Sequence, residues 1–305
     1  MSIINFYTTN KKKVRVSLFL LGLLFLGLLI DQSWNEVSGQ LNQINLLIFG
    51  ISVLVAVICN IVIAFYFGNL LAKFGVTIDK FLVLKMHLVG QIAKYIPGKV
   101  WGIAYQVSHV AGMSGAAGVV LANLELMIGA LFMTSIISVV LVSYLFDNSI
   151  SFVLLTLGLV GFVFIYKSNI VNSILSLVSQ KYRVTLGRKK IECRPTRSGD
   201  GIIFYLAFCS LYVISNVLML QAVFGFPVEE SILYIAILSA AWIGGFFAFI
   251  VPAGMGVREF LFVVISSHVV PQHSVEVLAS IAIFSRFWQI IQELVGVSLA
   301  IFLRR

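Results

Sequence analysis

The sequence predicts an all-α fold, a polytopic membrane helix bundle with two re-entrant Pro/Gly hairpins in an inverted repeat. Three observations support this fold class. Of the 305 residues, 60% are hydrophobic and 11% are charged, whereas soluble domains contain about 25% charged residues. Apolar runs long enough to cross a bilayer alternate with short polar segments, and two Pro-containing motifs interrupt stretches that are otherwise apolar. Because the chain has too few polar residues to cover a soluble surface, we expect an integral membrane protein.

The basic residues predict the orientation of the chain, because cations cluster on the cytoplasmic side of membrane spans. Cations at 11–15 precede the apolar run 16–30, and no small-residue cleavage site follows it, so we expect an uncleaved first helix with a cytoplasmic N-terminus. The segment 167–201 holds eight Lys and Arg residues against two acids, which predicts a cytoplasmic basic loop. Arg304 and Arg305 place the C-terminus on the same side. The net charge of +9 therefore reflects topology and lipid contact, and we expect no nucleic-acid partner.

The other apolar runs fall into two groups by length. Those long enough to cross a hydrocarbon core of about 30 Å are 46–68, 119–145, 150–166, 202–224 and 277–303. Two further pairs flank the Pro motifs, 81–90 with 100–112 and 232–251 with 260–270, and all four runs except 232–251 are shorter than the spans. Half-length segments around a Pro turn predict re-entrant hairpins. Interfacial amphipathic helices are the alternative for the first pair, and 232–251 could instead span outright.

The order of these segments predicts two related halves, 46–145 and 202–303, within a single transmembrane domain covering 1–305. Each half runs span, hairpin, span, and Pro97 lies 51 positions after Leu46 while Pro252 lies 50 positions after Ile202. The distribution of charges places the ends of the first hairpin inside and those of the second outside. Inverted repeats with broken helices that meet near the midplane are typical of transporters.

The two Pro motifs also predict a binding site. Its candidate residues are Pro97, Gly98, Lys99, Trp101, Gly254, Gly256, Arg258 and Glu259. Glycines let backbone N–H groups approach a ligand, and helix N-termini favour anions. Lys99 and Arg258 add positive charge, and the Arg fork suits a phosphate. We therefore expect a site for the phosphate of a lipid, although Lys94 and Lys99 could instead reach the headgroups and Trp101 could be an interfacial aromatic.

Charged residues within the spans complete the candidate set with Glu125 and Arg286. Isolated charges in hydrocarbon are unfavourable, so we expect Glu125 to pair with Arg286 or Arg258. Glu293 is a further charge of this kind. A gate, a proton-linked switch and a structural bond remain open as roles for these residues.

Catalytic and metal-binding patterns are absent from the sequence. Cys59, Cys193 and Cys209 show no paired spacing, and the four histidines form no pair with metal-ligand spacing. No cofactor, metal or catalytic residue is expected, and the protein is not expected to be an enzyme.

The two motifs resemble those of a known family. Residues 95–101 read Tyr-Ile-Pro-Gly-Lys-Val-Trp and 252–259 read Pro-Ala-Gly-Met-Gly-Val-Arg-Glu, as in the lysylphosphatidylglycerol-synthase-type transmembrane proteins, also called flippase-like membrane domains. Ala253 stands where Gly is usual, and Glu125 and Arg286 fall where the family tends to place them. Because no aminoacyl-transferase domain follows, the chain resembles the stand-alone members. The resemblance implies a bundle that moves lipids or lipid-linked sugars, in a prokaryotic plasma (inner) membrane.

Three functions follow as hypotheses. The first is a flippase that moves a phosphate-bearing lipid or a polyprenyl-phosphate-linked sugar. The second is a non-catalytic membrane partner of an envelope glycan or lipid biosynthesis enzyme, docked through the loop 167–201. The third is a membrane-embedded transferase that uses a lipid donor.

Overall fold

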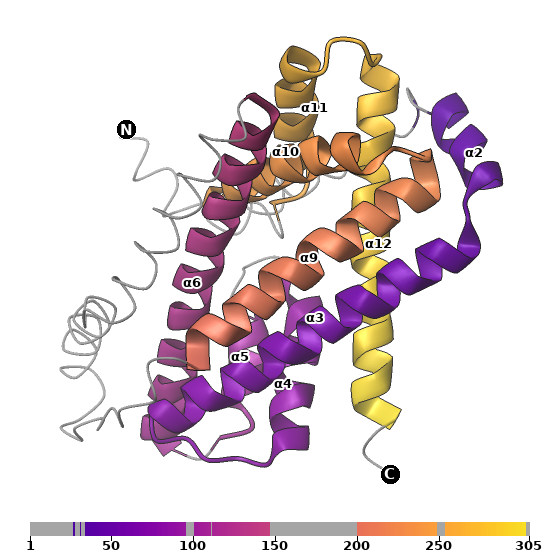
Figure 1. The fold of residues 1–305 in the computed structure, drawn as a ribbon. Helices are drawn as coiled ribbons and strands as arrows, with labels where there is room; N and C mark the ends of the chain where they lie inside the picture. Colours follow the sequence, from indigo (N-terminus) through magenta and orange to yellow (C-terminus); the bar gives the residue numbers. More distant parts are fainter. Residues whose placement is uncertain are drawn as a thin grey trace, which may run out of the picture.

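The computed structural model describes residues 27, 31, 34–95, 101–110, 112–146, 200–248 and 254–302. In this part of the chain the fold is all-helical, with nine α-helices and no strand (Figure 1). Most of the first apolar run, the predicted span 150–166, the basic segment 167–199 and the motif residues 96–100 and 249–253 lie outside the described residues.

In the described part of the chain, five helices are long and apolar enough to cross a membrane. They are α3 (Leu46–Lys73), α6 (Gly112–Phe146), α9 (Asp200–Phe224), α10 (Val228–Phe247) and α12 (Val275–Phe302). Four of them correspond to predicted spans. The chain is therefore a multi-pass membrane protein. The fifth, α10, covers most of 232–251, and its length alone is compatible with a full crossing.

Shorter helices flank the spanning ones. They are α2 (Trp34–Gln43), α4 (Lys80–Ile92) with the 3-10 turn η1 (Ala93–Tyr95), α5 (Trp101–Val107) and α11 (Val257–Val269). Side chains cap two helix starts, because Asn45 accepts the Ile48 N–H at α3 and Asp79 accepts the Phe81 N–H at α4. Three of the four segments predicted around the motifs are thus short helices, α4, α5 and α11, whereas 232–251 corresponds to the longer α10.

The helices α3 and α9 lie side by side and antiparallel (Figure 1). At one end the Asn45 N–H donates to the Ala222 carbonyl oxygen over 2.9 Å. At the other end the rings of Tyr66 and Tyr205 meet edge to face, with centroids 5.1 Å apart. Since residue numbers rise along α3 as they fall along α9, the first helices of the two predicted halves run in opposite directions.

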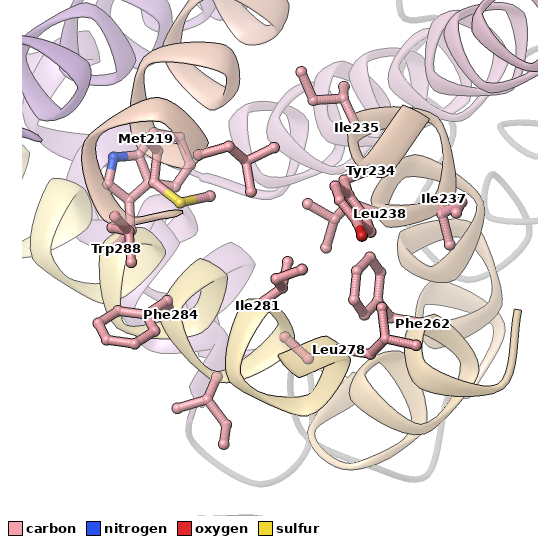
Figure 2. Packing of buried hydrophobic residues seen from close by; sticks show 14 of the residues in the cluster. Met219, Tyr234, Ile235, Ile237, Leu238, Phe262, Leu278, Ile281, Phe284 and Trp288 are labelled. Atoms are coloured by element: carbon pink, nitrogen blue, oxygen red, sulfur yellow. The ribbon is translucent and has the colours of Figure 1, made fainter. Parts of the chain in front are cut away.

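A large apolar core joins α9, α10, α11 and α12 (Figure 2). Tyr234 of α10, Phe262 of α11 and Leu278 of α12 are completely buried within it. The indole N–H of Trp288 donates to the Ser52 hydroxyl over 2.9 Å, which ties α12 to α3. This core fixes the second half of the chain around α12.

The outer faces of the spanning helices are apolar. Leu46 and Leu47 at the start of α3 are 78% and 74% exposed, and large apolar side chains such as Phe287 and Leu294 are exposed along α12. An apolar surface of this extent is unfavourable in water. It matches the lipid-facing surface expected of a membrane bundle.

Candidate functional site

The middle of α12 carries a polar face. Arg286, Gln289 and Glu293 are spaced at three and four residues, so they lie on one side of the helix. Arg286 is 6% exposed and Glu293 is 7% exposed. Because this helix is long and apolar enough to span a membrane, such charges require partners from other elements.

The second motif brings the start of α11 onto this face. Gly254 and Gly256 adopt positive φ angles of 67° and 83°, which a residue with a Cβ rarely tolerates. The Gly256 N–H donates to Oε2 of Glu259 over 2.6 Å, and Oε1 of Glu259 lies 2.8 Å from Nε of Arg286. Both carboxylate oxygens of Glu259 are therefore engaged, and this residue holds the start of α11 against α12.

Arg258 points to the same face but has no acid of its own. Its Nη1 donates to Oε1 of Gln289 over 2.7 Å, and Nη1 of Arg286 donates to the same oxygen over 3.3 Å. Among the described residues, no carboxylate lies within ion-pair distance of Arg258. Burial lowers the pKa of the Arg258 guanidinium below its ordinary value, and the like charge of Arg286 lowers it further. Two cations thus share one neutral acceptor.

The short turn η1, which follows α4, reaches α12 one helical turn further along. Lys94 of η1 donates to Oε1 of Glu293 over 2.5 Å, and Nε2 of Gln289 donates to the same oxygen over 3.2 Å. A continuous chain of hydrogen bonds therefore runs from Arg258 through Gln289 and Glu293 to Lys94. It connects η1, which lies just before the first Pro motif, with the start of α11 across α12.

Two polar atoms near Lys94 are buried and have no hydrogen-bond partner in the described part of the chain. They are Oε2 of Glu293 and the hydroxyl of Tyr95. Burial raises the pKa of Tyr95, and the negative charge of Glu293 raises it further, so its hydroxyl stays protonated. Leaving a buried polar atom unsatisfied costs about 1–3 kcal/mol, and more for a charged group. This is the least satisfied point of the polar network.

The network has a surplus of positive charge. Lys94, Arg258 and Arg286 contribute three cations, and Glu259 and Glu293 contribute two acids, which leaves one net positive charge. His87 on α4 adds none, because burial lowers its pKa to about 4 and the charge of Lys94 lowers it further. The arrangement can therefore accept one anionic group.

Glycines allow both hairpins to close tightly. A Cβ at Gly102 of α5 would lie 2.7 Å from the carbonyl oxygen of Gly90 on α4. In the second hairpin a Cβ at Gly254 would lie 2.8 Å from the carbonyl oxygen of Gly245 on α10. Gly90 and Gly245 each precede their motif proline by seven residues, whereas the facing Gly102 and Gly254 follow it by five and two residues.

Glu125 has a different partner from the one expected. The prediction paired it with Arg286 or Arg258, whereas the structure pairs it with Lys73, whose Nζ lies 2.8 Å and 2.9 Å from its two oxygens. The predicted span 46–68 also ended too early, because α3 continues to Lys73 and buries it. This extension is what brings the ammonium group within reach of Glu125.

The structure thus brings together Gly254, Gly256, Arg258, Glu259 and Arg286 from the predicted site. Pro97, Gly98 and Lys99 lie outside the described residues, and Trp101, at the start of α5, is 49% exposed. Sequence reasoning missed Gln289, although its spacing from Arg286 and Glu293 on one helix would have indicated it. It also left Glu293 outside the site.

The described residues contain no group of three or more His, Cys, Asp and Glu side chains that could hold a metal ion. Comparison of the chain with models of protein families, with curated proteins and with solved structures found no match.

Proposed function

We propose that this protein is an integral membrane flippase that moves a phosphate-bearing lipid or lipid-linked sugar across the plasma membrane. The observation that carries the proposal is the surplus positive charge where α11 starts against the polar face of α12. Arg258 is charged, half-buried and bound only to a neutral amide among the described side chains. A phosphate oxygen would replace that weak acceptor with a charged one.

The packing of the helices supports an inverted repeat. If α3, α4, α5 and α6 correspond in order to α9, α10, α11 and α12, each helix packing has a counterpart. The second helix of each half packs on the fourth helix of the other half, α4 on α12 and α10 on α6. The first helices, α3 and α9, pack on each other and run antiparallel. A two-fold axis in the membrane plane would relate helices in this way.

Two contacts support re-entrant hairpins. Nε2 of His273, in the loop after α11, lies 2.8 Å from Oε1 of Glu230 in the first turn of α10, so this hairpin returns to where it began. In the other half, a Cβ at Gly118 of α6 would lie 3.2 Å from the carbonyl oxygen of Phe74, which follows α3 directly and precedes α4 by six residues. The two hairpins would then enter the membrane from opposite faces, one from each, and place their motifs near α12.

The two motifs, with Lys99 and Arg258, are the basis on which we assign the chain to the lysylphosphatidylglycerol-synthase-type transmembrane family, as a stand-alone member. Under this proposal Arg258 binds the phosphate, with Lys99 as a second cation. Gly254 and Gly256 shape the turn, and Arg286 and Glu259 hold Arg258 in place. The cargo would reach this site when the hairpins part on one face and leave when they part on the other.

The proposal is tested by lipid binding and transport with Arg258→Ala. Purified wild type is expected to retain one phosphate-bearing lipid, measured by mass spectrometry, and to move a labelled phosphatidylglycerol across vesicle membranes. A hydrogen bond to a charged group contributes about 1.5–3 kcal/mol, so the variant should bind about 10- to 100-fold more weakly. Lys80→Ala, which removes an exposed cation at the start of α4, is the matched control. Wild-type transport in a folded Arg258→Ala variant would refute the assignment.

A further inference from the structure

Glu293 is a buried carboxylate whose two oxygens have unequal surroundings. Its side chain is 5% exposed. Oε1 accepts hydrogen bonds from Lys94 and Gln289, whereas Oε2 meets no partner among the described side chains. This buried oxygen without a hydrogen bond is the open position of the carboxylate.

The groups around Glu293 determine what protonation would change. Those that are charged or titratable are Lys94, Tyr95 and His87 near the end of the first hairpin, Arg258 and Glu259 on α11, Arg286 on α12, and Tyr212 of α9 beside Arg258. From α3 the uncharged amide of Asn60 donates to Gln292, which directly precedes Glu293 on α12. Lys94 is the direct ionic partner, and its side chain is 30% exposed. The pair therefore joins a partly exposed cation to a buried acid.

We propose that Glu293 binds a proton at Oε2 and thereby releases Lys94 to the anionic ligand. The step is a simple proton transfer, in which the carboxylate takes one proton and becomes a neutral acid while no other bond forms or breaks. The Tyr95 side chain already interacts with Glu293, and in this proposal its hydroxyl oxygen accepts the new O–H group. This inference rests on the proposed function, because it concerns the affinity of the same site for its anion.

Protonation changes the charge of the site in the direction that favours an anion. The net charge rises from one positive charge to two, and the ammonium group of Lys94 loses its ionic partner. Proton binding and anion binding must then favour each other by the same factor, because coupling between two sites is reciprocal. A proton gradient could in this way drive loading of the cargo on the acidic face and its release on the other.

The test is calorimetric binding of short-chain dioctanoyl phosphatidylglycerol to the purified full-length protein over a pH series, in two buffers of different ionisation enthalpy. The wild type should bind more tightly as pH falls, by up to about tenfold per pH unit for one coupled proton, and should take up close to one proton. Glu293→Gln mimics the neutral acid, so it should bind tightly at all pH values and take up none. Glu276→Gln, an exposed acid at the start of the same helix, is the matched control and should behave as the wild type.

A second measurement does not depend on the ligand. Infrared difference spectra of the lipid-free protein between alkaline and acidic buffer should show a carboxylic acid C=O band that Glu293→Gln removes and Glu276→Gln keeps. Binding that Arg258→Ala abolishes but that is independent of pH in the wild type would overturn the proton inference and leave the proposed function intact. Absence of specific binding would refute the proposed function. The infrared band would then still test whether Glu293 binds a proton. Absence of that band would overturn the inference in either case.

Discussion

Arg258 and Arg286 donate hydrogen bonds to the same side-chain oxygen, Oε1 of Gln289. Like charges at this separation repel each other, and an uncharged amide offsets that repulsion only weakly. Arg286 has Glu259 as a counter-ion, whereas Arg258 depends on the amide. Gln289 therefore orients Arg258 without neutralising it, which keeps its charge available for a ligand.

Gln289→Glu is expected to remove anion binding and to leave the fold intact. A carboxylate at this position would form an ion pair with Arg258 and compete with a ligand phosphate for the same guanidinium. Thermal unfolding in detergent should occur at an unchanged or higher temperature, while co-purification of phosphate-bearing lipid is lost. Gln272→Glu, the same substitution at an exposed position before α12, should change neither. Retention of the lipid by Gln289→Glu would show that Arg258 does not hold it.

The ion pair between Lys73 and Glu125 is expected to be structural. Lys73 is 8% exposed and Glu125 is 2% exposed, so removing either partner leaves a buried charge. Lys73→Met and Glu125→Leu should each destabilise the protein by about 3–5 kcal/mol, whereas the double variant Lys73→Met/Glu125→Leu should recover much of that loss.

Thermal unfolding of the four proteins in one detergent measures this effect. Lys80→Met, which removes an exposed lysine, is the control. Its unfolding temperature should equal that of the wild type. Losses that simply add in the double variant would mean that the two side chains do not interact.

The sequence was sufficient to predict four of the five described helices that could span a membrane, because length and apolar composition determine them. Four predicted spans agree with α3, α6, α9 and α12. The end of α3 was placed too early because Lys73 was interpreted as a loop cation. A lysine at a helix end can turn outward to headgroups or inward to an acid, and only the position of Glu125 on α6 decides between them.

Only part of the site was predicted, and the rest was missed for a similar reason. Arg258 and Glu259 stood out as charges beside a glycine turn, whereas Gln289 is uncharged and lies far from either motif in sequence. Pairing within the bundle depends on which helix faces pack together, and a single sequence gives no register between distant helices. The spacing of Arg286 and Glu293 indicated a shared face, but it did not indicate which cations would meet it.

Alanine at Gly102 or at Gly254 should open the corresponding hairpin. The new Cβ would lie 2.7 Å and 2.8 Å, respectively, from a glycine carbonyl oxygen on the facing helix, and Gly254 also has a positive φ. Backbone atoms cannot move aside as a side chain can, so a loss of about 1–3 kcal/mol is expected.

Gly50→Ala in α3 is the matched control, since its Cβ would meet nothing within 4 Å and alanine favours a helix by about 1 kcal/mol. The unfolding temperature should therefore fall for Gly102→Ala and Gly254→Ala, and it should stay level or rise for Gly50→Ala. Equal stability of all three would show that the close glycine contacts do not hold the hairpins together.

The inverted repeat predicts that the two hairpins begin on opposite faces of the membrane. Asp79 precedes α4 and Glu229 lies in the first turn of α10, and both are exposed. Single cysteines at these positions, in a background without the three native cysteines, should react with a membrane-impermeant maleimide from opposite sides of intact cells and inverted vesicles. A cysteine at His273 should react from the same side as one at Glu229, because His273 pairs with Glu230 and the hairpin returns to its starting face. Labelling of positions 79 and 229 from one side would contradict the inversion, whereas labelling of 229 and 273 from opposite sides would show that α10 crosses the membrane outright.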